Sequence, residues 1–283
     1  MKKYLITSWL KIVGITAASG LAFQNNELIL VSDNSNALYH YFINNDSLAK
    51  YSLDNNEIKD KLPKAEKLDL EAFTIFNNEW YAFGSGSKEN RNTAFAYNKT
   101  TSQSTKIDLK SLYDEMKSFS ELGNDDFNIE AVTTYNNDWY FLNRGNGSKN
   151  ANYIYVVQGK NLTDEYNLFF YEFNLPKIDN VSSGFSAATV LNNTLFFIAT
   201  AEDSTSTYND GTVKGSLFGA IDLKKMKLLF TEKISDHNKF EGMTIVEHNN
   251  KQVTFALCED VDNEDSNEAE IYKLVVDLKS KIK

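Results

Sequence analysis

One short segment recurs five times along the chain, with successive copies 52, 59, 56 and 55 residues apart. Each copy places one serine or glutamate among small and apolar residues, and we call these residues the anchors: Ser19, Glu71, Glu130, Ser186 and Glu241. An Asn-Asn pair follows each of the first four anchors after six residues and follows the fifth after eight. Because asparagine tolerates the left-handed backbone of a tight hairpin, each pair predicts a turn between two antiparallel strands.

The residues between the anchors complete a repeated β unit. A second apolar strand follows every turn, for example at residues 80–83 and 139–142, and a third strand and in most copies a fourth precede the next anchor. Three or four antiparallel strands repeated five times are typical of a β-propeller. The sequence therefore predicts an all-β fold, a five-bladed β-propeller, with six blades as the alternative if one copy has decayed. We expect residues 1–283 to form one domain, with one helical insertion at residues 110–122.

The two ends of the chain predict how the ring closes. The last copy ends at its third strand, residues 271–278, while residues 3–12 form a strand that belongs to no copy. Pairing these two strands would close the ring and remove two free sheet edges. A signal peptide is the competing interpretation, but Lys11 interrupts the apolar run after seven residues. We therefore expect a cytoplasmic protein, or an exported one if residues 1–18 act as a signal peptide.

Composition excludes several classes of partner and site. The 29 basic and 39 acidic residues give a net charge of −10, which argues against a nucleic-acid-binding surface. No stretch approaches the roughly 18 apolar residues that a membrane span requires. The single cysteine, Cys258, excludes an internal disulfide and a cysteine-rich zinc site, and three histidines argue against a His-rich metal centre. We expect a monomer that binds neither nucleic acid nor membrane.

The anchors also predict a metal site. In a propeller the innermost strand of each blade lines the central axis, so equivalent positions of the five blades face one another. Three carboxylates held together repel each other unless they are protonated or bridged by a cation. Serine and glutamate form an all-oxygen ligand set, which suits Ca²⁺ better than the tighter octahedron of Mg²⁺. We therefore expect the five anchors to bind an axial Ca²⁺; the alternative is that each glutamate accepts hydrogen bonds from neighbouring amides or water.

The anchor order Ser, Glu, Glu, Ser, Glu resembles the axial set of the calcium-activated nucleotidases (soluble apyrases), which are five-bladed propellers. Shorter segments resemble the same family: Gly184-Phe185-Ser186, Ala201-Glu202-Asp203, Phe240-Glu241-Gly242, Gly84-Ser85-Gly86-Ser87-Lys88-Glu89 and Phe141-Leu142-Asn143-Arg144. The whole chain more closely resembles a bacterial propeller family of unknown function. That likeness rests on Leu70-Glu71-Ala72, Asn143-Arg144-Gly145-Asn146-Gly147 and residues 201–211.

The resemblance to the nucleotidases implies a central calcium and hydrolysis of nucleoside di- or triphosphates at one mouth of the channel. Phosphoryl transfer needs a metal, cationic groups on the phosphate oxygens and a group that orients water. The candidate phosphate-binding residues are Lys88, Arg91 and Arg144, and the candidates for orienting water are Asp33, Glu202 and Asp203.

The sequence departs from the nucleotidase pattern at one place. Where that family carries an Asp-Arg pair, this chain has Asp33-Asn34, and asparagine does not replace the bidentate fork of an arginine. Two hypotheses therefore stay open, because propellers host both. The first is a calcium-dependent phosphohydrolase that acts on a small phosphate ester such as a nucleotide. The second is a non-catalytic propeller that binds a ligand or protein on its loop face, with a purely structural cation.

Overall fold

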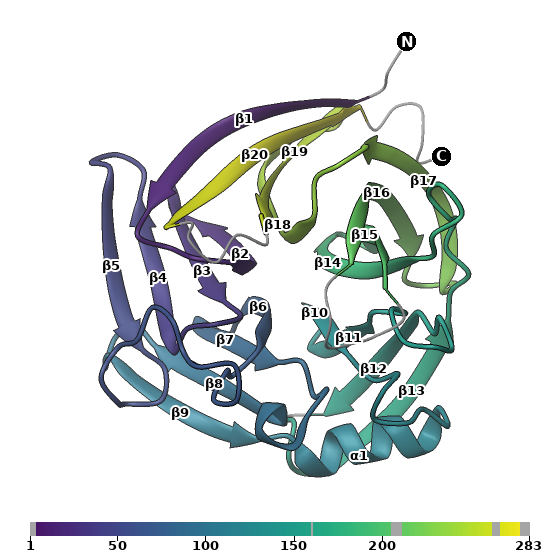
Figure 1. Ribbon diagram of the computed structural model, residues 1–283, viewed down its shortest axis with the longest axis horizontal. Helices are drawn as coiled ribbons and strands as arrows, with labels where there is room; N and C mark the ends of the chain where they lie inside the picture. The colour runs from purple at the N-terminus through teal and green to yellow at the C-terminus, as the bar shows by residue number, and fades with distance from the viewer. Residues whose placement is uncertain (1–3, 160, 205–210, 262–266, 278–283) are drawn as a thin grey trace.

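The computed structural model describes residues 4–159, 161–204, 211–261 and 267–277. Twenty strands in these ranges form five four-stranded antiparallel sheets, which stand around a central axis like the blades of a propeller (Figure 1). The all-β, five-bladed prediction is therefore confirmed. In the described part of the chain no helix is long and apolar enough to cross a membrane.

Each blade runs outward from the axis in chain order. The first blade contains β2 (Ala18–Gln24), β3 (Glu27–Ser32), β4 (Ala37–Phe42) and β5 (Ser47–Ser52). The second contains β6 (Leu70–Phe76), β7 (Glu79–Gly84), β8 (Thr93–Asn98) and β9 (Gln103–Asp108). The third contains β10 (Ile129–Tyr135), β11 (Asp138–Asn143), β12 (Tyr153–Gly159) and β13 (Tyr166–Glu172). The fourth contains β14 (Ser183–Leu191), β15 (Thr194–Asp203), β16 (Thr212–Asp222) and β17 (Lys227–Ser235).

The fifth blade combines both ends of the described chain. It contains β18 (Phe240–His248), β19 (Gln252–Glu259) and β20 (Glu268–Asp277), and β1 (Tyr4–Val13) is its outermost strand. β1 pairs antiparallel with β20, with Tyr4 opposite Val276, and the two lie side by side in Figure 1. The predicted first strand began one residue earlier, at a position outside the described residues.

The Asn-Asn pairs form the inner hairpins for the reason expected from the sequence. Both asparagines of the first three pairs have positive φ, between 48° and 67°. This backbone matches the two-residue turns whose twist fits antiparallel strands. In the fourth pair Asn192 has a φ of 56°.

Apolar side chains fill the spaces between neighbouring blades. Between the second and third blades, Phe83 packs edge-on against Trp139 and Phe141. The helix α1 (Lys110–Phe119) covers the same cluster with Leu112 and Met116, so the predicted helical insertion is present. Its last residue, Phe119, is 54% exposed. A short helix η1 (Glu89–Arg91) precedes β8.

A β-bulge lies at every anchor. The pairing of each inner strand with its neighbour skips one residue, and the skipped residues are the five anchors: Ser19, Glu71, Glu130, Ser186 and Glu241. A bulge inserts an extra residue into one strand and re-aims its side chain. The repeated bulge therefore explains why these polar residues stand apart from the apolar packing between blades.

Candidate metal site at one mouth of the channel

The first residues of the five inner strands meet at one end of the central channel. β2 contacts β6, and the ring continues through β10, β14 and β18 back to β2. At the level of the anchors the channel is lined by Ser19, Glu71, Glu130 and Glu241, and it leaves only about 10 Å³ for a water-sized sphere. That is room for about one water molecule.

The two serine anchors make the same hydrogen bond between blades. Ser19 Oγ donates to the carbonyl oxygen of Leu70, and Ser186 Oγ donates to that of Phe240 at 2.7 Å. In both cases the acceptor is the residue just before the next blade's glutamate anchor. The serine hydroxyls, both fully buried, thus fix the backbone that carries Glu71 and Glu241.

The hairpins of the blades bring a second layer of polar residues to this mouth. In four blades the backbone N–H of the residue that follows the second strand donates to the carbonyl oxygen of the residue two positions before the anchor. The donor and acceptor pairs are Asp33 and Ala17, Ser85 and Asp69, Arg144 and Asn128, and Asp260 and Lys239. Register is fixed by the bulge and turn of each hairpin, so these pairs stand at one level. We call this end of the channel the acidic mouth.

Arg144 is the centre of the charge network on the third to fifth blades. Its Nη2 donates to Glu202 Oε2 at 2.7 Å, and its Nη1 donates to Glu130 Oε1 at 3.3 Å and lies 3.7 Å from Glu241 Oε1. Burial alone would lower the pKa of Arg144, but these carboxylates outweigh it and raise the pKa. The side chain is therefore a permanent buried cation, and its Nε has no partner among the described residues.

Lys239 is the second buried cation of this region. Its Nζ lies 2.9 Å from Asp260 Oδ2 and 3.3 Å from Glu241 Oε1. Burial opposes its charge, yet Glu241 and Asp260 raise its pKa well above the ordinary value. Burial likewise opposes ionisation of Glu202, but the charges of Arg144 and Lys239 and the Gly211 amide lower its pKa.

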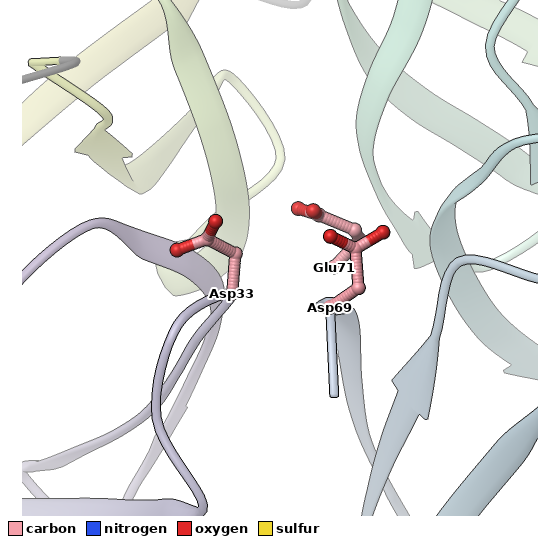
Figure 2. A group of neighbouring side chains, drawn as sticks. All are labelled: Asp33, Asp69 and Glu71. Atoms are coloured by element: carbon pink, nitrogen blue, oxygen red, sulfur yellow. The ribbon is translucent and has the colours of Figure 1, made fainter. Parts of the chain in front are cut away.

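The first and second blades form a different arrangement. One carboxylate oxygen each of Asp33, Asp69 and Glu71 lies within 4.8 Å of the others, and we call these residues the acidic trio. In Figure 2 Asp33 comes from the first blade, whereas Asp69 and Glu71 come from the second, across the junction. Lys67 Nζ binds Asp33 Oδ2 at 2.9 Å, and Arg91 Nη1 binds Asp69 Oδ2 at 2.7 Å.

Two carboxylates of the acidic trio have oxygens without a hydrogen-bond partner among the described residues. Asp33 Oδ1 is buried without a hydrogen bond, and the Glu71 carboxylate makes none with the described residues. Burial raises the pKa of Asp33 to about 6, against the opposing charge of Lys67. Burial and the nearby charges of Glu130 and Asp69 raise the pKa of Glu71 well above its ordinary range. Both carboxylates therefore hold protons more readily than exposed ones.

The acidic mouth as a whole is short of positive charge. Among the described residues, seven carboxylates face four cations there, an excess of three negative charges when all eleven groups are ionised. The carboxylates are Asp33, Asp69, Glu71, Glu130, Glu202, Glu241 and Asp260, and the cations are Lys67, Arg91, Arg144 and Lys239. Such a deficit is relieved by protons or by a bound cation.

The other sequence-predicted site residues lie in different environments. Arg91 is buried and paired with Asp69, and it also donates to Ser87 Oγ at 2.8 Å. Lys88 and Asp203 are exposed. The roles predicted for these residues stay predictions.

Sequence reasoning did not identify Lys67, Asp69, Lys239 and Asp260. A signal for two of them was present, because polar residues occur two positions before each glutamate anchor: Asp69, Asn128 and Lys239. Asn128 Nδ2 indeed donates to Glu130 Oε1 at 2.6 Å. Two positions before the serine anchors the residues are Ala17 and Gly184. A polar residue therefore occurs at this position only where the anchor is a glutamate.

Several proteins of unrelated function share this fold. The Malassezia sympodialis allergen Mala s 1 superposes with a TM-score of 0.55 at 10% identity, covering 97% of this chain and 96% of the allergen. Myxococcus xanthus glutaminyl cyclase gives 0.54 at 8% identity, covering 97% and 98%. A luciferin-regenerating enzyme gives 0.51 at 10% identity, covering 98% and 96%. At such identities the likeness shows the fold alone.

Sequence comparison gives a family without an assigned activity. Residues 14–276 match the model described as "Family of unknown function (DUF6929)". No curated protein matches the sequence. The resemblance to the nucleotidases stays a prediction.

Proposed function

The chain belongs to this family of unknown function, and we propose that it binds a divalent cation, with Ca²⁺ the best fit, at the acidic trio. The observation that carries the proposal is the approach of Asp33, Asp69 and Glu71 to within 4.8 Å, together with the buried, unpartnered Oδ1 of Asp33. A buried acceptor without a donor is rare in folded proteins and calls for a ligand, an ion or water.

The chemistry of the donors supports calcium. All three side chains offer carboxylate oxygens, and no thiol or imidazole belongs to the trio. Hard oxygen ligands suit Ca²⁺, which accepts six to eight of them in flexible geometry, whereas Mg²⁺ requires a near-ideal octahedron. A divalent ion would also remove two of the three excess negative charges.

The position of the proposed ion differs from the centre expected from the anchors alone. Glu71 belongs to both ligand sets. Glu130 and Glu241 already contact Arg144 and Lys239. The proposed ion lies toward the first and second blades, where Asp33 Oδ1 and the Glu71 carboxylate have no hydrogen-bond partner among the described residues.

Hydrolysis of a small phosphate ester is the second candidate function. It is favoured by Arg144 and Lys239, two cations at the same mouth as the trio. When bound, a divalent cation supplies Lewis-acid polarisation of a phosphoryl oxygen and activates water. An incoming phosphate would have to displace Glu202 or Glu130 from Arg144, whereas a cation at the acidic trio would displace no ion pair of Arg144.

Titration calorimetry on chelator-treated protein tests the cation site. We expect Ca²⁺ to bind with one-to-one stoichiometry and more tightly than Mg²⁺. The Asp33→Asn variant should lose at least tenfold in affinity, whereas Asp203→Asn, which changes the charge equally at an exposed position, should keep it. Equal affinity of the two variants would exclude the acidic trio as the site.

Phosphate release from ATP and ADP tests the second candidate. Activity that requires Ca²⁺ and is lost in both Asp33→Asn and Arg144→Lys would support it. If calcium binds without any phosphate release, the cation site stands and the hydrolase hypothesis fails.

A further inference from the structure

The opposite end of the channel contains a cavity of a different kind. It has a volume of about 210 Å³ and is lined by the later residues of β2, β6, β10, β14 and β18. Five threonines contribute to its wall: Thr74, Thr133, Thr134, Thr189 and Thr244. None of the described residues that line it is ionisable. We call this cavity the threonine cavity.

The repeat explains why hydroxyl groups gather there. Threonine occupies the position three residues after the anchor in four blades, as Thr74, Thr133, Thr189 and Thr244, and the first blade has Ala22. Equivalent positions of a propeller stand at one level around the axis. The threonines therefore form an incomplete ring of hydroxyls, with Thr134 as an addition from the third blade.

Most of these hydroxyls have no hydrogen-bond partner in the part of the chain that the structure describes. Thr244 Oγ1 accepts the amide of Phe23 at 3.1 Å, which ties the fifth blade to the first. Among the described residues, the hydroxyls of Thr74, Thr133, Thr134 and Thr189 make no hydrogen bond. The inner strands are also sheet edges, and backbone N–H and C=O groups of an edge strand need partners from outside the sheet.

The wall therefore selects a neutral molecule that carries several hydroxyl groups. A threonine hydroxyl both donates and accepts, so it matches another hydroxyl, whereas an ion would enter without a countercharge. Phe23, Phe73 and Met243 add apolar surface, which can cover the C–H faces of such a molecule. The volume corresponds to about seven water molecules in the liquid. We propose that the threonine cavity binds a small neutral polyol, up to the size of a monosaccharide.

This site is separate from the acidic trio. Between the two, the channel narrows at the anchors to a space for about one water molecule. Glycine or alanine follows every anchor, as Gly20, Ala72, Ala131, Ala187 and Gly242, which lets the blades approach closely there. A polyol could not pass, so binding at the threonine cavity does not depend on the cation.

Saturation-transfer NMR with erythritol, ribose and myo-inositol tests the proposal on the full chain. We expect at least one of these probes to bind, and the anionic sugar gluconate not to bind. The double variant Thr133→Val/Thr189→Val should weaken binding about tenfold, because two hydrogen bonds to the ligand are lost. Thr105→Val, at an exposed position of β9, is the matched control and should bind as the wild type does.

The variants are expected to fold, because the hydroxyls that they remove have no partner within the described protein. Thermal unfolding of the double variant within a few degrees of the wild type verifies this. No binding by any of the three polyols, or equal binding by the double variant, would overturn the proposal. Calcium titration of the same double variant should match the wild type, so that failure here is distinguished from failure of the cation site.

Discussion

The two ends of the channel are built from the same five strands, yet they carry opposite chemistry. At the acidic mouth each strand has a bulge, and the polar side chains there are charged and mostly paired. At the threonine cavity the polar side chains are neutral, and most of their hydroxyls have no partner among the described residues. In a repeated fold, side chains at equivalent positions of the inner strands meet at one level of the channel. The bulge determines which of these side chains face the axis.

The acidic mouth is itself uneven around the ring. The third to fifth blades supply Arg144 and Lys239, which form ion pairs with the carboxylates there. The first and second blades supply the acidic trio, where Asp33 Oδ1 and Glu71 lack donors. Glutamates in equivalent positions of the repeat therefore need not share one role.

Removing Arg144 should have the largest effect on stability. Arg144→Met keeps much of the side-chain volume but leaves Glu130, Glu202 and Glu241 without their shared cation. Breaking a buried ion pair from one side costs about 3–5 kcal/mol. Urea unfolding at pH 7 measures the loss in the free energy of unfolding. A loss below about 1 kcal/mol would show that the ion pairs of Arg144 do not stabilise the fold.

A substitution between the two ends should have the next largest effect. In Gly20→Ala the new Cβ would lie 2.7 Å from Val31 Cγ2 and 2.8 Å from Phe73 Cβ in the next blade. Overpacking of this kind costs about 1–3 kcal/mol. Gly123→Ala is the control, since nothing lies within 4 Å of its added Cβ. Thermal unfolding of the two variants side by side tests whether the blades are closely packed at this level.

The pH dependence of the stability of the metal-free protein should distinguish the acidic trio from the rest of the acidic mouth. Because burial raises the pKa of Asp33 to about 6 from an ordinary value of 3.8, the folded state binds the proton more tightly than the unfolded chain. Asp33 therefore makes the metal-free protein less stable as pH rises from about 4 to 6. Chemical unfolding between about pH 4 and 6 should therefore show that the free energy of unfolding falls less steeply with rising pH in Asp33→Asn than in the wild type.

Calcium affinity should rise with pH over the range in which the stability of the metal-free protein falls. Because a ligand carboxylate must be deprotonated, calcium affinity should fall by up to tenfold per pH unit below about pH 6. Calorimetry at pH 5, 6 and 7 measures this change. An affinity independent of pH would mean that Asp33 is not a ligand.

The smallest effects are expected at the threonine cavity. Thr189→Val removes a hydroxyl that has no partner among the described residues, and it should change stability by less than about 0.5 kcal/mol. Thr244→Val also removes the acceptor of the Phe23 amide and should cost about 1 kcal/mol more. Thermal unfolding of both variants measures this difference in stability. Equal stability of the two variants would mean that the hydrogen bond between Thr244 and Phe23 does not contribute to stability.

The fold was predictable because turn chemistry and strand pattern recur together. Asn-Asn after each anchor predicts a hairpin, and the repeat interval predicts the number of blades; both follow from local sequence. The gathering of Glu71, Glu130 and Glu241 at one mouth follows in turn from the equivalence of the inner strands.

The bonding within the mouth was not predictable to the same degree. Whether Ser19 faces an ion or the carbonyl of Leu70 depends on how closely two blades approach, and that distance is a result of packing. Asp33 and Asp69 lie 36 positions apart in the sequence, and only the junction between two blades brings them together. Arg144 is bound by carboxylates from two other blades, Glu202 and Glu241, which no local pattern reveals.

Crystals grown with calcium and measured at a wavelength where calcium scatters anomalously would locate the ion. We expect one anomalous peak at the acidic trio, within about 2.3–2.6 Å of oxygens from Asp33, Asp69 and Glu71. A peak between Glu130 and Glu241 instead, or no peak at millimolar calcium, would contradict this expectation.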